Sequence, residues 1–114
     1  MKRLLLVAAL AAGALVSWMS VAAEKPHADK PAGATVAISQ FAFSPKELTV
    51  PVGTRVVWTN RDEEPHVVTS AGNQFTSSQA LDTDDSYAVT FTKPGIYAYY
   101  CSIHPHMVGT IVVH

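Results

Sequence analysis

After residue 33 the pattern of hydrophobic and polar positions is that of short strands separated by turns, with almost nothing at a helical spacing. In the segment 55–60, Val56 and Trp58 fall on one face, while Arg55 and Thr59 fall on the other. Such alternation predicts a strand with one buried face. The same alternation predicts a strand at 87–92. Short extended segments bounded by turn residues, the first of them rich in β-branched and aromatic residues, predict further strands at 34–43, 48–50, 66–69, 96–101 and 108–113.

Turn-forming residues separate these segments and set their lengths. Proline lacks a backbone N–H and glycine adopts turn conformations easily, so Ser44-Pro45, Pro51 with Gly53, and Lys93-Pro94-Gly95 each end a strand. The polar stretch 70–85 is irregular and fits either a short helix or a loop. About seven or eight short strands at this spacing predict an all-β fold, namely an antiparallel β-sandwich. A closed β-barrel fits the pattern equally well and stays an alternative.

The first 33 residues differ from the rest of the chain. Lys2 and Arg3 precede an uninterrupted apolar run over 4–16, and the segment 21–23 ends in small residues, which is the pattern of a cleaved bacterial export signal. An uncleaved membrane anchor is the alternative, although the run is short for a bilayer span of about 20 residues. We therefore expect a signal peptide, a flexible polar leader and one folded domain, at residues 1–23, 24–33 and 34–114.

Composition and charge exclude several classes of protein. The chain has 8 basic and 9 acidic residues and a formal net charge of −1. Without the signal peptide the balance is 6 basic against 9 acidic, or 6 − 9 = −3. No cluster of Lys or Arg is left that could bind nucleic acid. One cysteine excludes a disulfide framework, and an unpaired thiol in an oxidising compartment needs burial or a bound partner.

Candidate chemistry gathers in one loop that follows a predicted strand, from Cys101 to Met107. A thiolate, imidazoles and a thioether so close together form a soft ligand set that favours copper, although imidazole also serves zinc. Cys101 and His104 supply two strong ligands, and His66 is the other histidine inside the predicted body that could supply a third. His106 in place of His104 stays an alternative.

These residues carry a resemblance to small type 1 (blue) copper proteins of the cupredoxin family, closest to amicyanin and plastocyanin-like proteins. The spacing C-x-x-H-x-x-M from Cys101 resembles that of amicyanin. Val67 stands where the family usually has an Asn that ties the ligand loops together, and Ile103 and His106 also depart from amicyanin's loop. Three further segments resemble the family: the first half of the domain (36–60), the strand before the cysteine (91–101) and the closing strand (108–113).

The resemblance implies the Greek-key β-sandwich of the cupredoxin fold over 34–114, with one copper ion cycling between Cu(I) and Cu(II). It implies His66, Cys101 and His104 as a trigonal ligand set and Met107 as a weak axial ligand. His66 is then expected to be buried, and His104 to be partly exposed as the electron port beside a docking patch of Pro105, Met107 and Val108.

The function that the resemblance implies is single-electron transfer in the periplasm. The expected partners are transient redox proteins, either a c-type cytochrome or a dehydrogenase. We expect a monomer that is not an enzyme, binds no nucleic acid and has no stable membrane association after cleavage. Acidic residues at 62–64, 82, 84 and 85 predict a negative potential that steers a basic partner, with a merely solvated turn as the alternative.

Other functions stay open at this point. A periplasmic copper carrier or copper-resistance protein uses overlapping ligands, but it needs an open and exchangeable site. An enzyme with Cys101 as nucleophile and His104 as base lacks an oxyanion turn and a third orienting residue. A structural zinc site needs a stronger ligand than Met107. An immunoglobulin-like domain normally has a cysteine pair around the position of Trp58.

Overall fold

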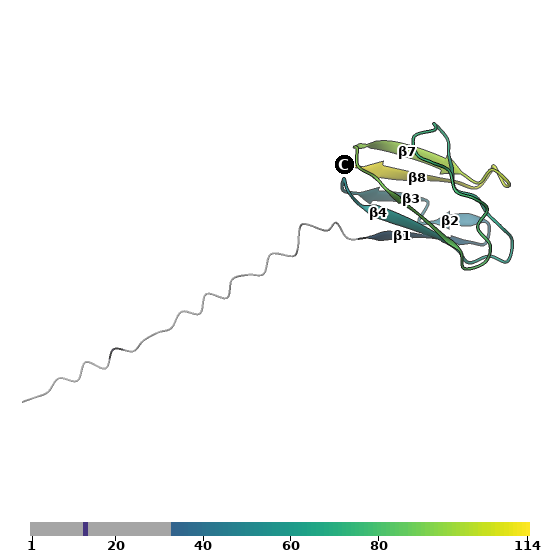
Figure 1. Cartoon of the computed structure of the whole chain (residues 1–114), viewed down its shortest axis with the longest axis horizontal. Helices are drawn as coiled ribbons and strands as arrows, with labels where there is room; N and C mark the ends of the chain where they lie inside the picture. The colour runs from purple at the N-terminus through teal and green to yellow at the C-terminus, as the bar shows by residue number, and fades with distance from the viewer. Residues whose placement is uncertain (1–12, 14–32) are drawn as a thin grey trace, which may run out of the picture.

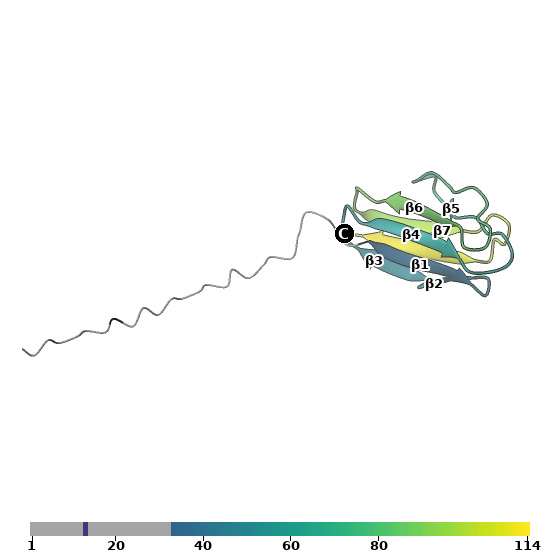
Figure 2. The ribbon, with the colours of Figure 1, turned by 60° about the horizontal axis from the view of Figure 1, so that its bottom comes forward.

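Two β-sheets packed face to face make up the fold (Figure 1). The structure, a computed structural model, describes Gly13 and residues 33–114, so the other residues of the predicted signal peptide and leader lie outside the described residues. The first sheet has the strand order β2-β1-β4-β6, and these strands lie side by side across one layer in Figure 2. The second sheet has the order β3-β8-β7-β5. The strands are β1 (Ala34–Ser39), β2 (Ala42–Ser44), β3 (Glu47–Val50), β4 (Arg55–Asn60), β5 (Thr69–Ser70), β6 (Ser86–Thr90), β7 (Gly95–Tyr100) and β8 (Val108–Val113).

Eight strands in two sheets confirm the predicted all-β sandwich and exclude the closed barrel. The described residues contain no helix, and therefore none long and apolar enough to cross a membrane. The antiparallel arrangement holds for most pairs, but β1 with β4 and β3 with β8 are parallel. The chain leaves the first sheet to form β3 in the second and then returns as β4 in the direction of β1. Side chains alternate between the two faces of a sheet in parallel and antiparallel pairs alike. The hydrophobic pattern of the sequence therefore does not distinguish parallel from antiparallel strands.

The strand predicted over 34–43 is in fact a hairpin. Ser39 pairs with Ala42, so Gln40 and Phe41 form a two-residue turn between β1 and β2. Both turn residues have positive φ angles, 54° and 57°. A two-residue turn of this kind usually contains Asn and Gly, because other side chains are strained there. The sequence pattern hid the turn because neither Gln40 nor Phe41 is a typical turn-forming residue such as Asn or Gly.

The segment after the charged turn is also less regular than predicted. Only Thr69 and Ser70 form a strand, β5, while His66 makes an isolated bridge with Leu81. The polar stretch 70–85 between β5 and β6 is loop rather than helix. This loop therefore passes directly beside His66.

The core lies between the two sheets and is rich in aromatic rings. Trp58 is fully buried, as the alternation in its strand predicted, and its ring meets that of Tyr99 edge to face at 5.4 Å. The ring of Phe43 packs on the other side of Tyr99 at 4.7 Å. Such pairs add about 0.5–1.5 kcal/mol each beyond the area they bury. The other buried apolar residues are Val36, Ile38, Val50, Val56, Val68, Leu81, Phe91, Cys101, Met107, Ile111 and Val113.

Tyr99 predicts a loss of stability at alkaline pH. Burial raises its pKa from 10.0 to about 12, although the neighbouring Trp58 side chain partly offsets this. Because the unfolded chain ionises this phenol at lower pH than the folded protein, the stabilisation is fully present below pH 10 and is lost as the pH rises from 10 to about 12. We expect the free energy of unfolding, from urea titrations, to fall by roughly 1.4 kcal/mol per pH unit in that window.

The matched variant is Tyr99→Phe, which removes the ionising group and keeps the ring. This variant should retain only a smaller slope due to Tyr87, whose pKa burial also raises. If the free energy of unfolding of Tyr99→Phe falls as steeply with pH as that of the wild type, Tyr99 does not cause the alkaline instability.

Candidate metal centre

Three of the predicted ligand residues converge at the end of the sandwich opposite the C-terminus (Figure 1). The donor atoms of His66, Cys101 and His104 all lie within 4.8 Å of one another. Cys101 and His104 belong to the loop between β7 and β8, whereas His66 belongs to the segment between β4 and β5. His66 and Cys101 are fully buried, and His104 is half-buried. The burial therefore matches the expected difference between an inner and an outer histidine.

Backbone hydrogen bonds fold the cysteine loop into two tight turns. The N–H of His104 donates to the carbonyl of Cys101 at 3.1 Å, and the N–H of Met107 donates to the carbonyl of His104 at 2.8 Å. The N–H of Cys101 then donates back to the carbonyl of Met107 at 3.0 Å, which closes the loop. Because each turn spans three residues, Cys101, His104 and Met107 lie close together in one compact loop.

The second ligand segment is held by the long loop before β6. The N–H of His66 donates to the carbonyl of Leu81 at 3.1 Å, and the N–H of Leu81 donates to the carbonyl of His66 at 2.7 Å. The buried side-chain amide of Asn60 donates to the carbonyls of Glu64 and Leu81, both at 2.8 Å. These bonds fix the turn between β4 and His66 and so set the position of the imidazole.

The spacing of the donor atoms fits a shared metal ion. The Sγ of Cys101 lies 3.8 Å from the Nδ1 of His66 and 3.8 Å from the Nδ1 of His104. Ligands bound to one first-row ion at about 2.3 Å (thiolate) and about 2.0 Å (imidazole), with a trigonal angle of about 120°, lie about 3.7 Å apart, close to both separations. A thiolate with two imidazoles and a nearby thioether is a donor set suited to copper.

One hydrogen bond joins the two ligand segments through the sulfur. The backbone N–H of Val67 donates to the Sγ of Cys101 at 3.3 Å. The apolar side chain of Val67 cannot form the hydrogen bond that is expected from an Asn side chain at this position. The backbone bond does not depend on the side chain, so the two segments stay connected through it.

Asp62 also belongs to the site, and the sequence analysis missed this role. Its Oδ2 lies 2.8 Å from the Nε2 of His66, and its carboxylate accepts the N–H groups of Gln40 and Phe41 at 2.7 and 2.9 Å. Burial raises the pKa of Asp62, but the bonds from Phe41, Gln40 and His66 outweigh it and hold the pKa below the ordinary value. No sequence signal separates this inward carboxylate from its exposed neighbour Glu63.

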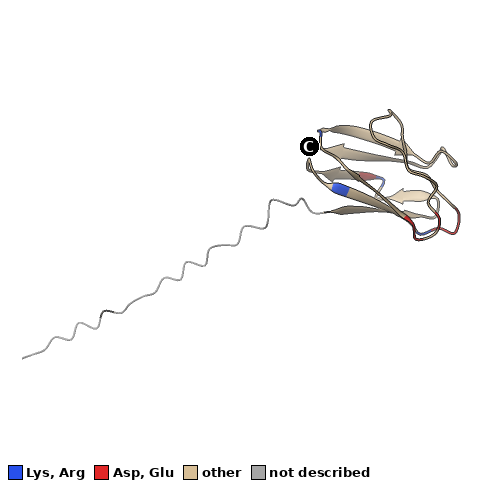
Figure 3. Cartoon of the chain, in the orientation of Figure 1, with Lys and Arg blue, Asp and Glu red and all other residues tan. Residues whose placement is uncertain are grey.

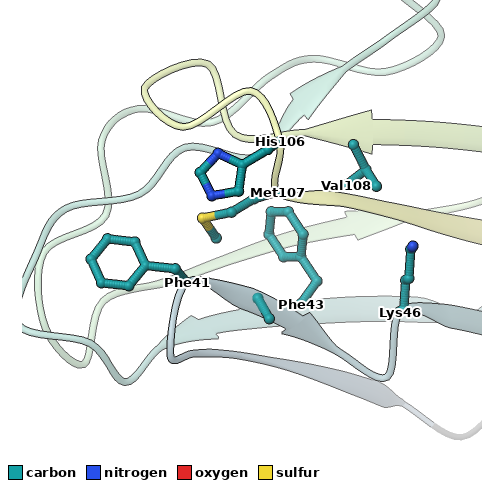
Figure 4. Close-up of a pocket in the computed structure, with 7 residues that line it drawn as sticks. Phe41, Phe43, Lys46, His106, Met107 and Val108 are labelled. Carbon is teal, nitrogen blue, oxygen red and sulfur yellow. The ribbon is translucent and has the colours of Figure 1, made fainter.

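Met107 and His106 are adjacent in this loop but differ in exposure. Met107 is 2% exposed, and His106 is exposed, with its ring centroid 6.4 Å from that of His104. Both line a pocket of about 230 Å³ at the seam between β2 and β8 (Figure 4). Among the described residues, His104 and not His106 belongs to the cluster around Cys101. The other lining residues are Phe41, Ala42, Phe43, Lys46 and Val108.

The apolar surface around His104 differs in part from the predicted docking patch. Pro105 and Val108 are exposed as expected, but Met107 is buried and cannot form part of a surface. Phe41 and Ile103 are exposed instead, at 40% and 49%. Phe41 was missed because it reaches the site from the β1–β2 turn, far away in the sequence. We call Phe41, Ile103, Pro105 and Val108 the apolar patch.

Negative charge gathers at the same end of the molecule. Figure 3 shows most of the acidic segments in the loops opposite the C-terminus. One of these acids, Asp84, is paired with Arg61 at 2.7 Å. Glu63 and Glu64 are exposed and, within the described part of the chain, make no ion pair.

Comparisons with known proteins agree with this geometry. A family model described as a cupredoxin-like domain matches residues 8–113. The curated amicyanin of Paracoccus versutus is 34% identical over 118 residues, covering 94% of this chain and 89% of that protein. A solved structure titled as a novel purple cupredoxin from Nitrosopumilus maritimus has a TM-score of 0.65 and 36% identity, covering 71% of this chain and 99% of the other. A Cu-containing nitrite reductase from Thermus scotoductus has a TM-score of 0.69 and 36% identity, but the match spans 75% of this chain and only 23% of that one.

Proposed function

The chain belongs to the cupredoxin-like family, and from this premise we propose that it binds one copper ion and carries single electrons between redox partners. The observation that carries the proposal is the pair of equal 3.8 Å separations from the Sγ of Cys101 to the two imidazole nitrogens. Cys101, His66 and His104 would hold the ion, and Met107 would contribute a weaker fourth donor.

The copper ion supplies the redox chemistry by alternating between Cu(I) and Cu(II). The chain supplies donors whose positions are fixed before any metal binds, because backbone bonds hold both ligand segments. Cys101 binds as a thiolate, since a coordinating thiol is deprotonated. The bond from the N–H of Val67 also orients this sulfur. Donors held in this way move little when an electron arrives or leaves, which is the condition for fast transfer.

We place the electron port at His104. It is the half-buried member of the cluster, whereas His66 and Cys101 are fully buried. Phe41 of the apolar patch packs against its ring, and Ile103 and Pro105 flank it in the chain, so the patch offers a small surface beside it that loses water easily. Small, transient interfaces are usual for electron-transfer partners.

The exposed acidic residues favour a basic partner, such as a positively charged c-type cytochrome. We expect the stopped-flow rate constant for reduction of such a cytochrome by the Cu(I) protein to fall at least about tenfold between low and high salt, because screening removes the attraction. The double variant Glu63→Gln/Glu64→Gln should be several-fold slower at low salt and unchanged at high salt. Lys93→Gln, a charge change at the opposite end of the sandwich, is the matched control.

Two outcomes would count against these proposals. A rate constant independent of salt would remove electrostatic steering but leave electron transfer intact. Slow electron exchange together with rapid loss of copper to a chelator would favour the second candidate, a copper carrier or resistance protein. Burial of His66, Cys101 and Met107 supports electron transfer, because a carrier needs ligands that an acceptor can reach.

We infer that the protein acts in the periplasm as a monomer and is not itself an enzyme. Export is supported by the sequence pattern of residues 1–23, so the mature protein would begin at Glu24. A role as carrier rather than enzyme is supported by the match over most of the length of amicyanin, against a small part of the nitrite reductase. A dehydrogenase as electron donor and a cytochrome as acceptor are compatible with the patch and the acidic loops.

A further inference from the structure

The turn between β1 and β2 is strained, because a two-residue hairpin of this kind needs positive φ angles and its residues are neither Asn nor Gly. Gln40 and Phe41 both adopt left-handed backbone conformations with φ of 54° and 57°. For residues other than glycine such conformations cost about 1–2 kcal/mol each. They persist where the surrounding structure imposes them, and this occurs most often at functional sites.

The group that stabilises this turn is the carboxylate of Asp62. Its Oδ1 accepts the N–H of Gln40 at 2.7 Å and its Oδ2 accepts the N–H of Phe41 at 2.9 Å. The segment that carries Asp62 is itself anchored, because the N–H of Asp62 donates to Asn60 and the carbonyl of Asp62 accepts the hydroxyl of Thr83. A fixed carboxylate with both oxygens facing the turn holds its two N–H groups together.

The same carboxylate reaches the buried histidine. Oδ2 of Asp62 lies 2.8 Å from Nε2 of His66, and the Asp62 side chain is only 11% exposed. An acceptor at this distance places the ring proton on Nε2 and leaves the lone pair of Nδ1 free toward the Sγ of Cys101. Asp62 therefore determines both the tautomer and the orientation of the His66 ring.

The strained turn also places an aromatic ring against the two histidines of the metal centre. The ring of Phe41 meets that of His66 edge to face at 5.3 Å and that of His104 edge to face at 5.1 Å. Figure 4 shows Phe41 projecting from the turn toward the side of the pocket where the sulfur of Met107 lies. A single ring thus packs against both histidines of the cluster.

We propose that Asp62 is a positioning residue that organises the metal centre twice, by fixing the His66 tautomer and by holding Phe41 over both histidine rings. This proposal rests on the proposed copper function only where it concerns the relative affinity for Cu(II) and Cu(I). A carboxylate hydrogen-bonded to a metal-binding imidazole makes that imidazole a better donor. Asp62 is therefore expected to favour Cu(II) over Cu(I).

The first test uses the metal-free protein and the variant Asp62→Asn. An Asn side chain has one accepting oxygen and one NH₂ group, so it cannot replace both carboxylate oxygens. If its oxygen takes the place of Oδ2, the N–H of Gln40 loses its acceptor, and the neutral oxygen binds the N–H groups of Phe41 and His66 more weakly than a carboxylate does. We expect the Nε2 proton of His66, followed by ¹⁵N NMR, to exchange with water at least about tenfold faster, and the Gln40 and Phe41 amides to lose protection. Glu63→Gln is the control with the same charge change on the exposed neighbour.

The second test measures the ratio of Cu(II) to Cu(I) affinity in the same variants. The ratio should fall several-fold in Asp62→Asn and stay unchanged in Glu63→Gln. If Asp62→Asn does not fold, Asp62→Glu, which keeps the carboxylate, should fold and retain the Nε2 proton signal in the metal-free protein. Loss of that signal in Asp62→Glu would overturn the proposal. So would equal Nε2 proton exchange rates and equal affinity ratios in Asp62→Asn and Glu63→Gln. A protected Nε2 proton in a protein that binds no copper would reject the copper function and leave the positioning role standing.

Discussion

Replacing Cys101 with serine is expected to remove the intense visible absorption of the copper-loaded protein. That absorption requires a thiolate bound to Cu(II), and Cys101 is the one cysteine of the chain. We also expect Cu(I) affinity to fall by more than about a hundredfold, because loss of a supporting outer-shell group alone costs about 10–100-fold. Absorption spectra and competition with a Cu(I) chelator measure the two effects.

Two histidine variants provide the control for this prediction. His104→Ala should lose the absorption as Cys101→Ser does, because its Nδ1 lies 3.8 Å from the sulfur. His106→Ala should keep it, because His106 is exposed and lies outside the cluster. The reverse result, loss in His106→Ala and retention in His104→Ala, would contradict the proposed ligand set.

Substitution of Gly109 by alanine is expected to cause a large loss of stability. A Cβ atom at this position in β8 would lie 2.3 Å from Cζ and 2.4 Å from the hydroxyl oxygen of Tyr99. The Tyr99 ring cannot move away easily, because it is 1% exposed and packed between Phe43 and Trp58. Overpacking of a tight core costs about 1–3 kcal/mol and sometimes more, and we expect about 3 kcal/mol here.

The matched control is Gly72→Ala, where the added Cβ meets only the Gln74 side chain at 3.4 Å. This variant should stay within about 0.5 kcal/mol of the wild type in urea unfolding. Combining Gly109→Ala with Tyr99→Leu should cost less than the sum of the two single changes, because the smaller side chain relieves the clash. A harmless Gly109→Ala would show that β8 and Tyr99 are less tightly packed than the structure indicates.

The sequence predicted the sandwich well because buried positions recur with a period of two in strands such as β1 and β4. Trp58 and Val56 are buried as the alternation required. The alternation carries no information on strand direction, so it did not reveal the parallel pairs of β1 with β4 and β3 with β8. It also missed the turn at 40–41, since the carboxylate that stabilises that turn lies more than 20 residues away.

The site was predicted to the extent that its chemistry is local in the chain. The spacing from Cys101 to Met107 brings soft donors together on one loop, and this pattern is visible without a structure. Asp62 and Phe41 reach His66 only through the fold, so spacing gave no indication of them. Met107 was wrongly included in the docking surface because apolar loop residues look alike in sequence, whether they face inward or outward.

The central claim, a copper centre built on Cys101, is tested most directly by the visible spectrum of the mature protein, from Glu24 onward, as Cu(II) is added. We predict an intense blue band that saturates at one copper ion per chain, bleaches with ascorbate and returns on reoxidation. A protein that stays colourless with Cu(II), or that takes up zinc in preference to copper, would contradict the claim.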